Sequence, residues 1–369
     1  MPVTPIPTAA APTSAVLAGD ERPVLLHHLL GLTTPTGLWE HALGTEPRVE
    51  HGMCVDDVAR ALVVTSRATR QRDTSRQAGE PTQQHDETLG LARIYLRFVR
   101  EAQRPGGLLH NRRSPAGAWL DTPSSGDHWG RALWALGAAA ARLPDGESAD
   151  DARRGASAAT GARSSYPRAT AYAALGAVEL LRVEPHHEGA RRLLHDARRT
   201  LPRPARDPHW PWPEDRLTYA NPVLPEAMIA MAQPLADDDL LGDGLLLLRW
   251  LVTEQTVDGH LSVVPAGGRG PDDARPGFDQ QPIEVSALAE AAATALRVTG
   301  DREWALVLER CAAWFEGAND TRVPVRDPLT GGGFDGLERA GVNQNQGAES
   351  TLAWLACAQL VSRGRAVAP

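Results

Sequence analysis

The segment VDDVAR places two adjacent carboxylates, Asp56 and Asp57, at the expected start of a helix. Successive residues of an α-helix point about 100° apart, so these two side chains cannot both address the same atom. We expect one of them to face a substrate and the other to cap the helix or pair with Arg60. The structural alternative is that both carboxylates only complement the positive end of the helix dipole.

Acid–base work on a glycosidic bond needs a second carboxylate from another element. Glu284 in QQPIE and Glu349 in NQGAE are the candidates, although a capping glutamate would occupy the same position in its helix. A helix N-terminus lowers the pKa of a carboxyl group, so the acid should lie deeper in its helix and closer to another acid. This favours a glutamate as the acid, paired with Asp57 or Asp56 as the base or nucleophile.

The same segments carry amide, aromatic and imidazole side chains, which can bind sugar hydroxyl groups and the apolar face of a sugar ring. We expect substrate-binding roles for His51, Asp127, His128, Trp129, Arg131, Trp210, Trp212, Tyr219, Asn221, Gln280, Gln281, Asn343, Gln344, Asn345 and Gln346. An N-cap is the structural alternative for Asp127, and a polar turn that caps its own helix is the alternative for residues 343–346.

The composition excludes several classes of protein. A formal charge of −8 argues against a nucleic-acid partner, which needs clustered positive charge. All 38 basic residues are arginines, so no lysine can form a Schiff base or hold a nucleotide phosphate. The sequence holds no HExxH motif and no closely spaced cysteines, so we expect no metal and no cofactor. The scattered Cys54, Cys311 and Cys357 favour a reducing compartment.

Helical periodicity dominates the chain, and strand signals are short. Six Ala/Leu-rich helices are expected after polar or Gly/Pro-rich openings, which begin at His51, Ser125, Ser165, Thr218, Phe278 and Asn343. More highly charged helices are expected between them, from Asp86, Glu147, Glu188, Gly242 and Asp301, with PVLLHHLLGL near the N-terminus as a sixth. Alternation of apolar and charged helices, at a spacing of roughly sixty residues, is typical of a repeat architecture.

We therefore predict an all-α fold, an (α/α)6 toroid with short extended loops at the mouth of its inner helices; an open solenoid is the alternative. The expected division is a flexible segment over 1–20, one barrel domain over 21–362 and a tail over 363–369. The inner-helix N-termini would converge on one funnel and bring the candidate side chains together. The start of the chain lacks the pattern of a signal peptide, and no apolar stretch approaches about 20 residues. We expect a cytoplasmic protein without a membrane partner.

Five motifs in order, namely HGMCVDDVARAL, GRALWALG, TYANPVLPEAM, FDQQPIEVSALAEA and NQNQGAESTLAWL, resemble bacterial proteins of the six-hairpin glycosidase-like superfamily. More narrowly, they resemble a branch often labelled glycosyltransferase, which occurs beside or fused to retaining glycosyltransferases. The tandem aspartate is also similar to that of the mannan-cleaving family 76 glycoside hydrolases. This chain carries Met53 and Val58 where the branch usually has Tyr and Asn, and Ala220 where an aspartate is usual.

The resemblance implies a carbohydrate-active enzyme that cleaves or rearranges a glycosidic bond by carboxylate acid–base catalysis. The expected substrate is an oligosaccharide or glycoconjugate, of the mannose type by analogy, and phosphate could replace water as the acceptor. One alternative is a non-catalytic glycan-binding or scaffolding partner of a glycosyltransferase. A sugar epimerase would use inward imidazoles, for which His51 and His128 are available. A terpenoid cyclase would need more than the 5% of aromatic residues found here.

Overall fold

The computed structural model describes residues 26–73 and 83–366. The expected flexible segment over 1–20 and the last three residues of the expected tail lie outside this part. The final helix continues to Ala366, past the residue at which the tail was expected to begin.

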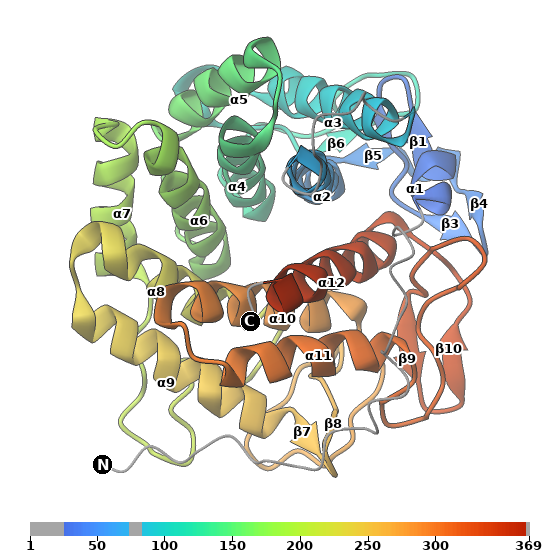
Figure 1. Cartoon of the computed structure of the whole chain (residues 1–369), viewed down its shortest axis with the longest axis vertical. Coiled ribbons are helices and arrows are strands. Elements are labelled where there is room, and N and C mark those ends of the chain that lie inside the picture. The colour runs from blue at the N-terminus through green and yellow to red at the C-terminus, as the bar shows by residue number, and fades with distance from the viewer. Residues whose placement is uncertain (1–25, 74–82, 367–369) are drawn as a thin grey trace.

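Six helices form the inner ring of a toroid, and each of them begins after one of the polar openings in the sequence (Figure 1). They are α2 (Val55–Asp73), α4 (Asp127–Arg142), α6 (Pro167–Val183), α8 (Val223–Leu235), α10 (Pro282–Thr299) and α12 (Ala348–Ala366). Each inner helix contacts the next, and α12 contacts α2, so the ring is closed. The prediction of an (α/α)6 toroid is confirmed, and the open solenoid is excluded.

The outer layer consists of the more highly charged helices, which alternate with the inner ones along the chain. They are α3 (Gln83–Ala102), α5 (Gly146–Ala159), α7 (Glu188–Thr200), α9 (Asp238–Glu254) and α11 (Glu303–Phe315), with the short α1 (His27–Leu32) beside α12. The outer helices are amphipathic, so only their apolar stripes pack on the ring. No helix in the described part of the chain combines the length and hydropathy needed to cross a bilayer.

Small residues allow the inner helices to lie close together, most clearly between α4 and α6. A Cβ atom on Gly130 would overlap the carbonyl oxygen of Ala169, and one on Gly176 would overlap that of Leu133. Backbone-to-backbone contact of this kind requires a residue without a side chain. The Ala/Gly content of the inner segments therefore sets the width of the ring.

Short antiparallel ribbons and two 3-10 turns occupy the connections. The ribbons are β1 (Thr33–Thr34) with β2 (Gly37–Leu38), β3 (Ala42–Leu43) with β4 (Glu46–Pro47), β5 (Met53–Cys54) with β6 (Arg112–Arg113), β7 (Thr256–Val257) with β8 (His260–Leu261), and β9 (Gly336–Glu338) with β10 (Gly341–Asn343). The 3-10 turns are η1 (Val49–His51) and η2 (Pro105–Gly107). Several of these loops meet the inner-helix N-termini, where they build the mouth of the toroid.

Candidate active site at the mouth of the toroid

The first turn of α2 is held in place by Asn111, which lies in the loop after α3. The backbone N–H of Val55 donates to both the carbonyl and the side-chain oxygen of Asn111, at 2.9 and 3.1 Å. This fixes the two aspartates that follow. Asp56 and Asp57 then point in different directions, as their helical spacing predicts.

Asp57 is a buried carboxyl group, 3% exposed. It accepts a hydrogen bond of 2.6 Å from Arg60 Nη1 and one of 3.2 Å from the Cys54 thiol. Burial raises the pKa of Asp57 to about 7, because the positive charge of Arg60 only partly offsets desolvation and the nearby carboxylates of Glu349 and Glu40 add to the rise. Asp57 therefore carries its proton over most of the acidic range.

The pKa of Asp56 is shifted in the opposite direction from that of Asp57. It accepts a hydrogen bond of 2.5 Å from Arg131 on α4 and one of 3.0 Å from the side-chain amide of Asn111. Burial acts to raise the pKa of Asp56, but the charges of Arg131 and Arg60 outweigh it, and the pKa lies below its ordinary value. Two neighbouring carboxyl groups thus differ in charge at a pH between their two pKa values.

Glu349, in the first turn of α12, reaches the same guanidinium from the other side. Arg60 Nη2 donates to Glu349 at 2.7 Å, while Nη1 of the same guanidinium donates to Asp57. The Glu349 side chain is 42% exposed, so it is the member of this group that a ligand in the mouth can reach directly. Arg60 couples α2 to α12 across the point where the ring closes.

Glu40, in the loop between β2 and β3, also lies close to Asp57, although the sequence analysis did not identify it as a site residue. Glu40, Cys54 and Asp57 each place one ligand atom within 4.8 Å of the others. The negative charge of Glu40 adds to the rise in the pKa of Asp57, so we assign Glu40 to the electrostatics of Asp57.

Asp127 and Tyr219 continue the polar network around the ring. The Tyr219 hydroxyl donates to Asp127, whose carboxylate also lies 3.8 Å from Arg131. Asp127 is the first residue of α4 rather than its N-cap, which is Gly126. Tyr219 is 43% exposed, and the Arg168 guanidinium lies over one face of its ring, 5.2 Å from the centroid, so only the other face can meet a ligand at the mouth.

Glu284, in the first turn of α10, is buried and hydrogen-bonded within the protein. It is 2% exposed, and both of its oxygens are occupied, by the backbone N–H of Ala220 and, at 3.0 Å, by the side-chain amide of Asn221. Burial raises the pKa of Glu284 to about 7, against the lowering effect of these two donors. In this structure Glu284 anchors the loop that carries Tyr219, and its expected catalytic role stays a prediction.

Asn221 is also an internal brace rather than a sugar ligand, since it is fully buried. Its oxygen accepts from the backbone N–H of Thr218 at 2.9 Å and from Arg168 at 3.1 Å. Arg168, on α6, forms two hydrogen bonds of 2.8 Å with Glu214. These contacts use every donor and acceptor of the Asn221 amide except one N–H, which leaves little for a substrate.

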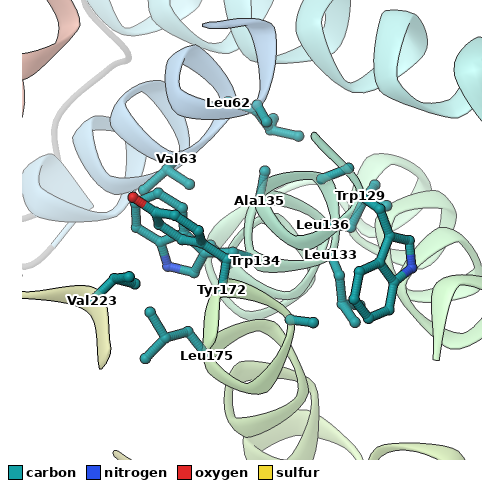
Figure 2. Close-up of a cluster of buried hydrophobic side chains, with 14 of the residues drawn as sticks. Leu62, Val63, Trp129, Leu133, Trp134, Ala135, Leu136, Tyr172, Leu175 and Val223 are labelled. Atoms are coloured by element: carbon teal, nitrogen blue, oxygen red, sulfur yellow. The ribbon is translucent and has the colours of Figure 1, made fainter. Parts of the chain in front are cut away.

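The tryptophans expected to stack on sugars are used for packing. Trp212 is 1% exposed, donates to Glu214 at 3.2 Å and stacks on Trp250, with ring centroids 6.2 Å apart. Trp210 packs edge-on against Trp250 at 5.0 Å. Trp129 is 1% exposed and donates to the carbonyl of Ala159, on the side of α4 opposite Trp134 (Figure 2). Trp129 and Trp212 are corrected to structural residues because no ring face is open.

The two histidines expected at the mouth form hydrogen bonds with nearby residues of the protein. His128 is buried and forms a 3.0 Å hydrogen bond with the carbonyl of Leu109. His51 lies on the exposed rim, where its ring nitrogen is 3.0 Å from that of His41. Neither imidazole is placed as the inward base that an epimerase would need.

Most of the amides are also engaged within the protein, and burial leaves Gln280 and Gln346 without access to a sugar. Gln280 is fully buried and donates to Gly277 and Asp320; Gln346 is buried between Thr330 and Asp327; Asn345 accepts from Gly44; and Asn343 accepts from the backbone N–H of Asn345. Gln344 is exposed and Gln281, the N-cap of α10, is partly exposed. The amides before α12 therefore mainly tie that helix to the loops around it.

A narrow cavity lies on the axis below the mouth and is lined by all six inner helices, among them by Arg60, Val63, Trp134, Tyr172, Val223 and Ile283. Figure 2 shows Val63, Trp134, Tyr172 and Val223 gathered on this side of α4. The cavity has room for about two water molecules. A sugar ring does not fit there, so a sugar ligand would bind above Arg60.

The chain matches no protein-family model and no curated protein sequence. Its fold is similar to that of solved structures at low identity. A sugar epimerase from a ruminal bacterium has a TM-score of 0.64 at 15% identity, over 92% of this chain and 95% of the epimerase. A D-mannose isomerase has a TM-score of 0.62 at 11% identity, over 91% and 95%. The GH76 α-mannanase of Bacteroides thetaiotaomicron has a TM-score of 0.58 at 11% identity, over 90% of each chain.

These likenesses agree with the (α/α)6 toroid fold and leave the activity open. They do not show the narrower resemblance to the glycosyltransferase-associated branch, which stays a prediction.

Proposed function

We propose that this protein is a carbohydrate-active enzyme that cleaves or rearranges a glycosidic bond at the mouth of the toroid. These two aspartates replace the expected pairing of an aspartate with Glu284 or Glu349. Asp57 would supply the proton to the leaving oxygen, and Asp56, which points in another direction, would act as the ionised base or nucleophile at the anomeric carbon. The observation that carries the proposal is the contrast between these neighbours, since one pKa is raised to about 7 and the other is lowered. Paired carboxyl groups with separated pKa values are what glycosidic acid–base catalysis requires.

Glu349 and Tyr219 complete the proposed site as the exposed groups around this pair. Glu349 can accept hydrogen bonds from sugar hydroxyl groups, and the uncovered face of the Tyr219 ring can pack on the apolar face of a sugar. Asp57 is 3% exposed, so the bond to be cleaved has to approach to the level of Arg60. A mannose-type substrate is the first choice, because two structural neighbours are named for mannose or mannan.

Turnover of a sugar panel tests this proposal. The purified protein would be incubated with manno-, gluco- and galacto-oligosaccharides, with and without phosphate, beside Asp57→Asn and Asp56→Asn variants. A control, Asp239→Asn, changes an exposed carboxylate on the outer helix α9. Cleavage that survives in the control and is lost in both variants is expected. Cleavage that persists in Asp57→Asn would overturn the assignment of the acid.

A second candidate, a glycan-binding partner of a glycosyltransferase, is favoured by the burial of Asp57 and Glu284 and by Ala220 in place of an aspartate. Binding without cleavage, retained in Asp57→Asn, would support it. The epimerase alternative is favoured by the likeness to a sugar epimerase. It predicts exchange of a sugar C–H proton with D₂O, which NMR would detect, but it lacks an inward imidazole at His51 or His128.

A further inference from the structure

Arg269 is a buried guanidinium without a carboxylate ligand, in the loop between β8 and α10. The residue is 1% exposed, and its Nη2 donates to the carbonyl of Glu254 at 3.0 Å. Its Nε and Nη1 atoms are fully buried and have no acceptor among the described residues. Since the side chain cannot easily lose its proton, a positive charge remains in the interior there.

The carboxylates nearest to Arg269 are engaged elsewhere. Asp320 lies 2.9 Å from His260 and 2.6 Å from the amide nitrogen of Gln280. Asp273 accepts from Arg216 and from the backbone N–H of Gly270, both at 2.8 Å. The remaining one, the side chain of Glu254, binds Arg275.

The pKa of Arg269 also reflects the lack of a direct carboxylate partner. Burial, with the charge of Arg275 adding to it, lowers the pKa of Arg269 to about 10 although three carboxylates act in the other direction. Arg269 is still charged at neutral pH. Two N–H groups of the charged guanidinium thus lack an acceptor among the described residues, which a bound anion would supply.

Two further buried polar groups lie at the same end of the β7–β8 ribbon. Gln255 and Ser262 are opposite each other, joined by a 2.8 Å hydrogen bond from the backbone N–H of Ser262, so their side chains share one face. The amide nitrogen of Gln255 and the hydroxyl of Ser262 are buried and also lack partners among the described residues. The bond from Arg269 to Glu254, the residue before Gln255, brings the guanidinium to this end of the ribbon.

We propose that Arg269 binds one small monovalent anion, of the size of chloride or bromide, with Gln255 and Ser262 as further donors. An anion held by two guanidinium N–H groups would replace the missing carboxylate. A larger oxyanion is disfavoured because every donor is fully buried. This inference does not depend on the catalytic proposal.

The anion would brace the mouth of the toroid. The backbones of Arg269 and Leu217 exchange two hydrogen bonds, at 2.8 and 2.9 Å. Leu217 begins the loop that carries Tyr219 and Asn221, which in turn binds Glu284. Neutralising Arg269 would therefore stabilise the segment that presents Tyr219.

Bromide tests the site directly, because its anomalous scattering identifies it in a crystal. Crystals of the full chain soaked in sodium bromide should show an anomalous peak within hydrogen-bonding distance of Arg269 Nε or Nη1. In solution, Tm should rise with chloride or bromide and saturate, whereas sodium gluconate at equal ionic strength should give no such rise. Arg269→Met should abolish the halide effect.

The matched control is Arg216→Met, which changes a half-exposed arginine of the neighbouring loop that is already paired with Asp273. It should keep both the halide effect and the peak. Ordered water at Arg269 in bromide-soaked crystals, or equal Tm curves in bromide and gluconate, would overturn the proposal. If Arg269→Met does not fold, the diffraction experiment on the unaltered protein still decides.

Discussion

Asp56 and Asp57 are adjacent in the chain, yet their carboxyl groups bind guanidiniums on different elements, Arg131 of α4 and Arg60 of α2. The helical spacing separates their directions, and the two surroundings separate their pKa values. Arg131 dominates at Asp56, whereas burial dominates at Asp57. A single turn of α2 thus holds a charged and a neutral carboxyl group side by side near pH 6.

The first prediction concerns the pH dependence of turnover. Because Asp57 must be protonated to act as an acid, activity should fall as the pH rises through about 7. Asp56 must be ionised, and its lowered pKa places the loss of activity on the acid side below its ordinary value of 3.8. The measurement is kcat/KM from pH 3 to 9. Activity that increases steadily above pH 7 would contradict the assignment.

Glu349→Gln should move the alkaline limb of that profile to lower pH. The negative charge of Glu349 helps to raise the pKa of Asp57, so its removal should lower that pKa, by up to about one unit for a partly exposed neighbour. Glu338→Gln, which changes an exposed carboxylate on β9, serves as the control and should leave the limb unchanged. A shift to higher pH in Glu349→Gln would be inconsistent with this coupling.

Glu226, deeper in the ring, should make stability depend on pH. Burial and the charge of Glu290 raise its pKa to about 8, against 4.5 for an ordinary glutamate. A carboxyl with a raised folded-state pKa destabilises the protein as the pH rises from about 4.5 through about 8. Glu226→Gln should therefore raise the free energy of unfolding at pH 9 by about 1–3 kcal/mol.

The same substitution should have little benefit at pH 4, where Glu226 is protonated in the folded and in much of the unfolded protein. Urea unfolding at both pH values measures the difference. Glu188→Gln on α7 is the control, since that side chain is 82% exposed. A benefit equal at pH 4 and pH 9 would show that Glu226 is not neutral in the fold.

Gly176, in the contact between α4 and α6, and Gly242, on α9, should respond differently to substitution by alanine. Gly176→Ala should lower the free energy of unfolding by about 1–3 kcal/mol, because the new methyl group would overlap the backbone of Leu133. Gly242→Ala, on the exposed side of α9, meets no atom within 4 Å and should be neutral or stabilising by up to about 1 kcal/mol. Thermal unfolding of the two variants checks the contrast.

The sequence was sufficient to predict the ring and its order. Alternation of Ala/Leu-rich and charged helices is a local property, and a closed ring is one way to bury six apolar helices together. The tandem aspartates were also identified correctly as pointing apart, because 100° per residue is a property of any helix. These inferences needed no knowledge of distant contacts.

The lining of the mouth was harder to predict, because it depends on contacts between residues far apart in the sequence. Glu40 lies near Asp57 because its loop is bound to Gly52, to Arg112 and to the start of α12, and no local motif signals these contacts. Trp212 sits on a Pro-rich loop that reads as exposed, yet Trp250 of α9 covers it. Whether a polar side chain such as Gln346 meets a ligand or a neighbouring loop is decided by such contacts.

The cavity between the inner helices, which Trp134 and Tyr172 help to line, has room for about two water molecules. Nothing as large as a sugar can pass through the ring, so entry and departure share one opening. A polymer could not be threaded through and would have to present a chain end, or lie across the rim. For an enzyme of this shape, each product must leave before the next substrate arrives, and product should compete with substrate for the same opening.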